Sequence, residues 1–439
     1  MFLLFKRCLK VASLEDIKNF AIIGGGTLGV GFAQIALLAG YEKVTVIDLD
    51  TKILDKTREM IQYRIESLQS EENFNELLSK SDMPDVSKKN IDIKHVLNNF
   101  EFVGIIAHGV DTKIIMSRLN TEVDLSKGVA DADFIIEAVP EILELKQDIF
   151  KKLGELSQSH SILATNTSAM SITKIAQNCV RPEQVIGLHF HTFFPIFGML
   201  IEITPGDKSS DKALEIGQEI AHKFPCLNGK RFIVQLKKES TGLIGNRISF
   251  PEMLYFDWFI NHAIAKGISF DQLDAAGFSH DLYDQIGLDT VYNVLKYLEK
   301  NLSPEFAPGE RLTNLLKQGR LGKKIGKGYY DWNENVPTKN IPSVDPKTMA
   351  FLKQNYDGEI FEALKLNEGC RLLEEGVVDS FKLIDKVILH GFFIKGPFVQ
   401  GKKKYMEWSK KLDDLVEKTG ISYFKPCEMM KSGRFLSYR

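Results

Sequence analysis

Cysteine is scarce and scattered in this sequence. The 439 residues include five cysteines, and no two of them have the close spacing of a metal-binding or redox-active pair. They are Cys8, Cys179, Cys226, Cys370 and Cys427. We therefore predict neither a disulfide framework nor a metal site, and we expect a reducing compartment.

Long apolar runs and an excess of charge are also lacking. No run approaches the roughly 18 apolar residues of a membrane helix, and the formal net charge of -2 favours neither a nucleic-acid nor a membrane partner. With 44% hydrophobic and 26% charged residues, the chain is expected to be a soluble protein of two or three domains. The start MFLLFKRCLK is too short for a secretory signal. We expect a cytoplasmic protein; basic residues without acids before Glu15 leave a mitochondrial matrix location as the alternative.

A glycine motif stands between a predicted strand and a predicted helix. The apolar residues 21–23 precede Gly24, Gly26 and Gly29, and a helix is expected over 28–39. A second strand over 44–47 follows and ends at Asp48. Strand, glycine turn, helix, strand and acid, in this order, are typical of a dinucleotide-binding fold. The alternative is an ordinary tight turn.

The residue types in this motif indicate NAD rather than NADP. Gly24 allows the tight turn, Gly26 lets the backbone approach a pyrophosphate, and Gly29 lets the helix pack closely on the strand. Asp48 is expected to accept hydrogen bonds from both ribose hydroxyls and to repel a 2′-phosphate. No arginine follows in Leu49, Asp50 and Thr51 to receive such a phosphate.

Polar residues interrupt apolar segments between residues 162 and 203. His189 ends one apolar run and Glu202 lies inside another, and a buried carboxylate requires a partner. A carboxylate that binds one imidazole nitrogen raises the basicity of the other, which suits a general base. A purely structural His–Glu pair is the alternative.

Together these segments resemble the L-3-hydroxyacyl-CoA dehydrogenase family over most of the chain. The matching motifs are GGGTLG, Glu137-Ala138 with Glu141, Thr165 to Ser168, Leu188 to Phe190, Glu202, TGLIGNR with Asn246 and Arg247, and Gly322 to Tyr330. The resemblance implies NAD-dependent oxidation of a 3-hydroxyacyl-CoA thioester, or the reverse reduction. It also implies a Rossmann-type α/β domain followed by all-α C-terminal domains of the 6-phosphogluconate-dehydrogenase-like kind.

The resemblance also assigns roles to individual residues. His189 would take the proton of the substrate hydroxyl, Glu202 would hold the imidazole, and Ser168 and Asn246 would hydrogen-bond the reacting oxygen and the thioester carbonyl. The residues expected at the cofactor are Gly24, Gly26, Thr27, Leu28, Gly29, Asp48, Ala138, Glu141, Lys146, Ser168 and Thr192. The alternatives are a helix-capping role for Ser168, a loop role for Asn246 and solvated positions for Glu141 and Lys146.

The sequence departs from the family pattern in several places. Thr192 replaces an amide that in the family contacts cofactor and substrate. One extra residue between Pro195 and Glu202 must be absorbed in a loop if Glu202 is to reach His189. A Gly-Pro-Phe motif is missing after Gly277, which affects the acyl pocket.

Two other functions are compatible with parts of the sequence. A catalytically weak, NAD-binding structural or regulatory relative would fit the altered Thr192 and the missing motif. The other function is that of a β-hydroxyacid dehydrogenase. It would need a lysine four residues after Asn246, and Phe250 at that position argues against it.

The tail suggests an internal duplication. Residues 363–392 mirror residues 255–278, with Gly376 at the position of Gly267 and Asp385 at that of Asp274. The predicted parts are an N-terminal extension (1–14), an NAD-binding domain (15–237), a helical domain (238–341) and a second, degenerate copy of it (342–439). Two copies would cover each other and give a monomer, with a dimer or an unrelated helical tail as alternatives.

Helices are also predicted outside the motifs. The expected ranges are 51–80, 243–266, 290–301 and 312–318, and an irregular segment is expected over 81–90.

Overall fold

The structure, a computed structural model, describes residues 13–68, 71–80, 111–192, 194–333 and 336–438. Most of the expected N-terminal extension and the irregular segment over 81–90 lie outside these ranges. The chain divides into two compact units. Unit one comprises residues 1–239 together with 390–393, and unit two comprises residues 240–389 and 394–438 within the described part.

Unit one is built on a largely parallel sheet with the strand order β3-β2-β1-β4-β5-β6-β7-β8. Only β6 and β7 pair in antiparallel fashion among the described strands. The strands are β1 (Asn19–Ile23), β2 (Lys43–Ile47), β3 (Leu119–Glu122), β4 (Phe134–Glu137), β5 (Ile162–Thr165), β6 (Val185–Phe190), β7 (Leu200–Pro205) and β8 (Phe232–Gln235). The order outward from β1 is that of a Rossmann-type sheet, which confirms the predicted fold class.

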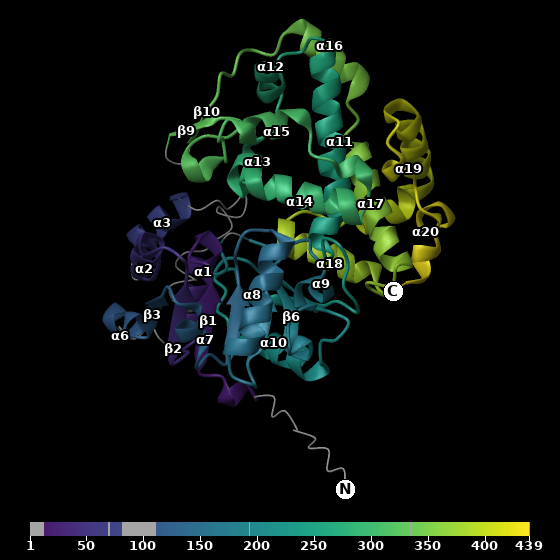
Figure 1. Cartoon of the computed structure of the whole chain (residues 1–439). Helices are drawn as coiled ribbons and strands as arrows, with labels where there is room; N and C mark the ends of the chain where they lie inside the picture. Colours follow the sequence, from purple (N-terminus) through teal and green to yellow (C-terminus); the bar gives the residue numbers. More distant parts are fainter. Residues whose placement is uncertain (1–12, 69–70, 81–110, 193, 334–335, 439) are drawn as a thin grey trace. The chain divides into compact units, whose positions relative to one another are not determined.

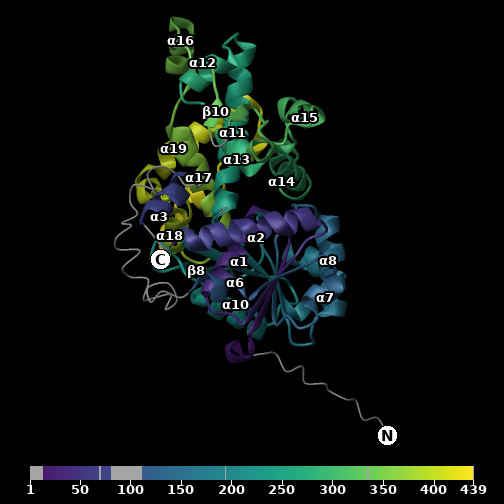
Figure 2. The same cartoon turned by 90° about the vertical axis from the view of Figure 1, so that its left-hand side faces the viewer.

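Helices cover both faces of this sheet. Figure 2 shows α1 and α10 on one side of the fanned strands and α7 and α8 on the other. The helices of unit one are α1 (Thr27–Leu38), α2 (Thr51–Glu66), α3 (Glu71–Lys80), α6 (Thr112–Met116), α7 (Leu125–Val129), α8 (Leu143–Leu156), α9 (Ile172–Ala176) and α10 (Asp211–Lys223). Because both faces are covered, central strands such as β4 and β6 are buried at every position and are mostly apolar, with Glu137 and His189 as buried exceptions.

The single helix predicted over 51–80 is wrong. Helix α2 ends at Glu66, and the next helix, α3, begins at Glu71. Ser67 follows the end of α2, and its hydroxyl donates a hydrogen bond of 2.7 Å to the carbonyl of Tyr63. No glycine or proline stands between residues 63 and 71, so the sequence pattern alone did not reveal the break.

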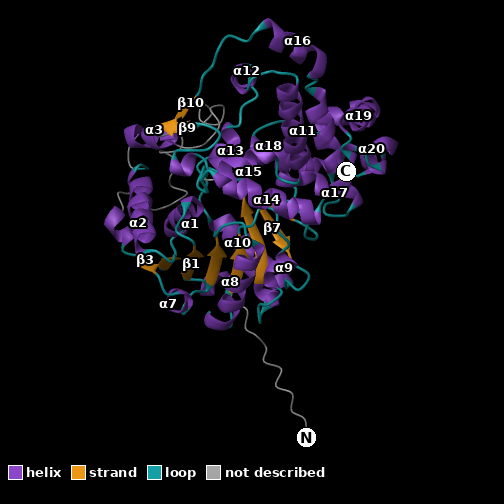
Figure 3. Ribbon diagram, turned by 45° about the horizontal axis from the view of Figure 1, so that its top comes forward, coloured by secondary structure: helices purple, strands orange, loops and turns teal. Residues whose placement is uncertain are grey.

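Unit two is mainly helical (Figures 1 and 3). Its helices are α11 (Gly245–Ala265), α12 (Phe270–Ala275), α13 (Asp281–Ile286), α14 (Leu288–Asn301), α15 (Glu310–Lys317), α16 (Pro346–Asn355), α17 (Glu359–Glu374), α18 (Phe381–Phe392, of which the last three residues belong to unit one), α19 (Phe398–Thr419) and α20 (Glu428–Ser432). A small hairpin of β9 (Asp331–Asn333) and β10 (Val336–Thr338) accompanies them. The helices predicted at 243–266, 290–301 and 312–318 correspond to α11, α14 and α15. Within the described residues, no helix combines the length and the apolar character needed to span a membrane.

The two segments predicted to repeat have corresponding local structure. Helix α11 is followed by Gly267 with φ of 77°, and α17 is followed by Gly376 with φ of 68°. The next helix in each case, α12 or α18, carries the matching aspartate, Asp274 or Asp385. Helices α11 and α17 also pack against each other. These features support the duplication, which itself remains a proposal.

Candidate functional site

Several of the predicted site residues of unit one lie at the carboxyl ends of its parallel strands. Gly24 follows β1, Asp48 follows β2, Ala138 follows β4, and Ser168 lies in the loop after β5. His189 is the second-last residue of β6. In open α/β sheets this edge is where ligands bind.

The glycine turn has the steric properties that a dinucleotide requires. Gly24 has φ of 109°, in the region that favours glycine, and a Cβ on Gly29 would lie 1.9 Å from the carbonyl oxygen of Gly24. A Cβ on Gly26 would meet nothing within 4 Å, so that glycine leaves open space at the start of α1. Gly26 and Thr27 are exposed, and Leu28 is half-buried. In the part of the chain that the structure describes, no side chain caps the N-terminus of α1, so its first N–H groups suit a pyrophosphate.

Asp48 is held by the glycine turn. One carboxylate oxygen accepts a hydrogen bond of 2.8 Å from the backbone N–H of Gly25, and the other accepts one of 2.7 Å from Leu49. The carboxylate is thus fixed at the carboxyl end of β2, beside the loop that would bind the pyrophosphate. The residues present fit NAD.

A buried ionic network lies between β4, α8 and the loop after β5. The ammonium of Lys146 is 2.6 Å from Glu137 and 3.1 Å from Glu141, and the side chain is 1% exposed. Glu141 in turn accepts a hydrogen bond of 2.7 Å from the backbone N–H of Ser168. Glu141 and Lys146 are therefore buried, and the solvated positions considered for them are wrong.

Electrostatics keep Glu141 and Lys146 charged. Burial alone would raise the pKa of Glu141, but the Lys146 ammonium and the bond from Thr167 lower it. Burial alone would lower the pKa of Lys146, but the Glu137 and Glu141 carboxylates raise it. The network fixes Ser168 through charge-assisted hydrogen bonds.

His189 and Glu202 are direct cross-strand partners on β6 and β7. The Nδ1 atom of His189 lies 3.7 Å from Oε2 of Glu202, and the two side chains are 7% and 0% exposed. β6 ends at Phe190 and β7 begins at Leu200, so the expected extra residue between Pro195 and Glu202 does not prevent this pairing. The buried carboxylate thus faces the imidazole that the sequence suggested.

A second imidazole, which the sequence analysis did not single out, shares the same carboxylate. Nε2 of His191 is 3.3 Å from Oε2 of Glu202, closer than the nitrogen of His189. Side chains alternate along a strand, so residues 189 and 191 face the same side. The His-x-His spacing at the strand end was the signal that could have identified His191.

Burial and this neighbour set the protonation of the group. Burial lowers the pKa of His189, and His191 lowers it further, whereas Glu202 acts in the opposite direction. Burial would raise the pKa of Glu202, but the two imidazoles lower it to about 2. The carboxylate is ionised and the His189 imidazole is neutral near pH 7.

Asn166 and Thr192 shape the backbone around His189. The side-chain oxygen of Asn166 accepts a hydrogen bond of 2.9 Å from the N–H of Phe190. The Thr192 hydroxyl accepts one of 3.0 Å from the N–H of Phe194, which closes the turn after β6. Thr192 therefore stabilises this turn in the described structure.

Asn246 and Arg247 belong to unit two, at the start of α11. The guanidinium of Arg247 is buried and contacts Glu368 and Glu375 of α17, with a distance of 2.7 Å to Glu375. Asn246 is half-buried. Because it lies in the other unit, its role beside His189 stays a prediction.

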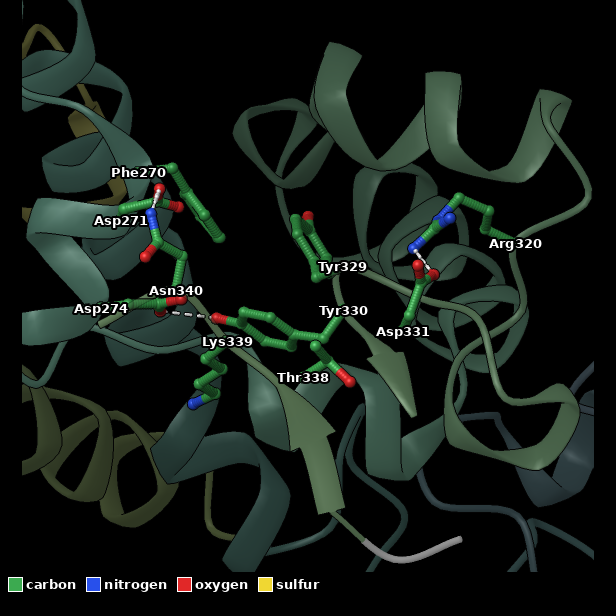
Figure 4. Close-up of a pocket in the computed structure, with 10 residues that line it drawn as sticks. All are labelled: Phe270, Asp271, Asp274, Arg320, Tyr329, Tyr330, Asp331, Thr338, Lys339 and Asn340. Atoms are coloured by element: carbon green, nitrogen blue, oxygen red, sulfur yellow. Dashed lines mark hydrogen bonds and ion pairs between the residues drawn. The ribbon is translucent and has the colours of Figure 1, made fainter. Parts of the chain in front are cut away.

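The Gly322–Tyr330 motif also lies in unit two, where it surrounds a buried aspartate. Asp284 accepts hydrogen bonds from the N–H groups of Tyr329 and Tyr330 at 2.7 and 3.0 Å. A Cβ on Gly328 would lie 2.0 Å from Asp284, so only glycine fits. A polar cavity of about 240 Å³ adjoins the motif. Figure 4 shows that its wall is paired, with Tyr330 bonded to Asp274 and Arg320 to Asp331.

Comparisons with known proteins agree with this geometry. Residues 19–104 and 92–235 match the 3-hydroxyacyl-CoA dehydrogenase NAD binding domain, and residues 242–332 match the C-terminal domain of the same family. A probable 3-hydroxybutyryl-CoA dehydrogenase of Deinococcus radiodurans is 28% identical over 320 residues, which cover 72% of this chain and 100% of that protein. The fatty acid oxidation complex subunit alpha of Shewanella loihica is 33% identical over 330 residues, covering 70% of this chain but 45% of that subunit.

A solved structure extends the likeness in fold. The crystal structure of 3-hydroxybutyryl-CoA dehydrogenase from Escherichia coli K12 is similar with a TM-score of 0.68 and 22% identity. The match covers 96% of this chain and 99% of that one, so it includes most of the tail after Pro342. A wholly unrelated tail is therefore disfavoured on grounds of fold.

The sheet order, the glycine turn and the acid after β2 define a Rossmann-type, dinucleotide-binding protein. The sequence matches to an NAD binding domain and to a C-terminal domain identify its family. The chain belongs to the 3-hydroxyacyl-CoA dehydrogenase family, whose members here are NAD-dependent oxidoreductases acting on a CH–OH group.

Proposed function

We propose that this protein oxidises an L-3-hydroxyacyl-CoA to the 3-oxoacyl-CoA, with His189 as the general base and Glu202 as its partner. The observation that carries the proposal is the cross-strand pairing of these residues at the carboxyl edge of the sheet. The glycine turn and Asp48 lie at the same edge, so proton acceptor and cofactor loop belong to one site.

Each buried group has one task in this mechanism. Neutral His189 accepts the proton of the substrate 3-hydroxyl on Nε2, while Glu202 orients Nδ1 and stabilises the imidazolium that forms. NAD⁺ supplies the acceptor for the hydride from the same carbon. Removal of the hydroxyl proton as the hydride departs avoids a discrete alkoxide.

Ser168 and Asn246 position the substrate in this proposal. Glu141 fixes the backbone of Ser168 and lies within 3.4 Å of its hydroxyl oxygen. That hydroxyl would bond the reacting oxygen, and Asn246 would bond the thioester carbonyl. Lys146 does not contact the substrate in this proposal, because its ammonium is already held by Glu137 and Glu141. It acts through Glu141, which fixes Ser168.

The direct test is NADH formation with L-3-hydroxyacyl-CoA substrates of short, medium and long chain. Relatives named for 3-hydroxybutyryl-CoA make the four-carbon thioester the first substrate to measure. We expect turnover with the L-enantiomer and NAD⁺, and the D-enantiomer serves as the control. Absence of activity with every chain length would contradict the proposal.

The base is tested by His189→Gln, which should reduce kcat by about two to four orders of magnitude while NAD⁺ binding changes little. His160→Gln is the matched control, because His160 also pairs with a carboxylate, Asp133, at 2.8 Å, but adjoins the amino end of β4. Near-normal turnover in His189→Gln would remove this residue from the mechanism. Glu202→Gln should likewise lower kcat more than it changes KM.

A further inference from the structure

His189, His191 and Glu202 form a compact cluster of potential metal ligands. One ligand atom from each residue lies within 4.8 Å of the other two. A tetrahedral zinc ion with bonds of roughly 2.0–2.1 Å places its ligand atoms about 3.3–3.4 Å apart. The distances of 3.3 Å from Glu202 to His191 and 3.7 Å to His189 are close to this spacing.

The nitrogens that face the cluster are not otherwise satisfied. Within the described part of the chain, Nδ1 of His189 and Nε2 of His191 are buried and make no hydrogen bond of normal geometry. Both side chains are 7% exposed. Buried polar atoms normally have a partner, so this pair of nitrogens indicates room for a ligand that binds lone pairs.

The cluster is also held in place from several sides. His189 is in β6, and Glu202 is its register partner in β7. The ring of His191 packs on Phe392, with ring centres 4.8 Å apart, and a Cβ on Gly391 would lie 3.6 Å from His191. These neighbours belong to unit one. A preorganised set of this kind loses little freedom when a cation binds.

We propose that these three residues form a site for Zn²⁺ that inhibits the enzyme. Two imidazoles and one carboxylate are a ligand set typical of zinc, and they leave a fourth position for water. The sequence prediction of no metal site considered only cysteine spacing, which does not report on this set.

The inhibition rests on the proposed role of His189 as the base. When a metal occupies Nδ1 of a neutral imidazole, the single ring proton resides on Nε2. Nε2 is the atom that must accept the hydroxyl proton, so the metal-bound ring cannot take it. No electron is transferred, and removal of the metal returns the lone pair to Nε2.

The binding test uses the full-length protein after chelator treatment. We expect isothermal titration to show one Zn²⁺ per chain, and Co²⁺ to give the visible absorption of a four-coordinate ion. His191→Phe should weaken binding at least tenfold, whereas His160→Gln should not. His191→Gln, checked by circular dichroism, serves if the phenylalanine variant fails to fold.

Activity separates the two proposals. We expect Zn²⁺ to inhibit the wild type, a chelator to reverse the inhibition, and His191→Phe to need at least tenfold more Zn²⁺. No binding, or binding that His191→Phe and His191→Gln leave unchanged, would overturn the metal site. Binding at the cluster without inhibition would uphold the site and count against His189 as the base.

Discussion

Asp48 shows how one side chain can serve both the fold and the cofactor. Its carboxylate accepts hydrogen bonds from the backbone N–H groups of Gly25 and Leu49. The bond from Gly25 ties the end of β2 to the glycine turn. We expect the same charge to repel a 2′-phosphate on the cofactor ribose. A substitution of Asp48 can therefore alter both the hydrogen bonding of the glycine turn and the charge beside the ribose.

Two variants separate these effects. Asp48→Asn keeps an oxygen that accepts the hydrogen bond from the N–H of Gly25 but removes the charge. Asp48→Ser removes the charge and, because its side chain is shorter, also weakens this hydrogen bond. We expect a strong preference of the wild type for NAD⁺ over NADP⁺, weakened in both variants, with poorer NAD⁺ binding in Asp48→Ser. The ratio of kcat/KM for the two cofactors measures this. Comparable wild-type efficiency with NADP⁺ would contradict the role of Asp48.

His280 is a buried imidazole without a carboxylate partner among the described residues. It is 3% exposed and stacks on Tyr329 with ring centres 4.2 Å apart. Burial, and then the positive charges of Arg311 and Lys339, lower the pKa of His280 to about 3. The folded state therefore keeps this ring neutral well below the pKa of an unfolded histidine.

A pH dependence of stability follows from this shift. Between the unfolded pKa of about 6.5 and the folded value, the unfolded chain binds the proton and the folded chain does not, so stability falls as pH falls. From pH 6.5 to pH 5 this group should cost about 2 kcal/mol. Urea unfolding of the wild type and His280→Phe should show a shallower acid loss in the variant. Parallel pH profiles would show that His280 does not contribute.

At the scale of the element, the start of α1 depends on two glycines for different reasons. Gly29 allows the helix to approach Gly24, because any Cβ there would overlap the backbone carbonyl. Gly26 has no such neighbour among the described residues, and its φ of -72° suits any residue. Its open space matters only if a ligand approaches the backbone.

Substitution by alanine should distinguish these reasons. Overpacking a core typically costs about 1–3 kcal/mol. Gly29→Ala should destabilise the protein by more than this, since the backbone must move to accept the methyl group. Gly26→Ala should leave the melting temperature nearly unchanged but weaken NAD⁺ binding at least tenfold, because its methyl group faces the pyrophosphate. Calorimetry and cofactor titration of both variants test this. Equal NAD⁺ affinity in Gly26→Ala and the wild type would place the pyrophosphate elsewhere.

At the scale of the whole molecule, the tail is joined to the first helical segment by buried charge as well as apolar packing. Arg247 of α11 contacts Glu368 of α17, and Tyr423 donates a hydrogen bond of 2.8 Å to the same carboxylate. Leu366, Leu372 and Leu373 of α17 are buried. Loss of the tail would leave the guanidinium of Arg247 without these partners.

Deletion of residues 342–439 should therefore expose an apolar face and give a chain that dimerises, aggregates or fails to fold. The full-length protein should be a monomer if the two helical copies cover each other. Light scattering on both chains is the measurement, and Arg247→Met probes the charge alone. A full-length dimer, or a truncated chain that remains a fully active monomer, would contradict the internal pseudo-dimer.

The sequence by itself determined the NAD-binding half of unit one. The strand, glycine turn, helix and acid from residue 19 to 48 are local features, and short-range sterics make their spacing specific. The main helices of unit two were predictable for a similar reason, because their apolar period and end signals lie within each segment. The division of the predicted helix over 51–80 was missed, because no glycine or proline marks the end of α2 in the sequence.

Only the tertiary structure decided how the buried charges are shared. The sequence suggested one imidazole for Glu202, whereas the pairing of β6 and β7 brings two to it, and His191 is the nearer. It predicted Glu141 and Lys146 near the cofactor, with solvated positions as the alternative, whereas packing between β4 and α8 buries both in one ionic network. Such partners come from separate strands and helices, and their distances depend on register and packing that no local pattern encodes.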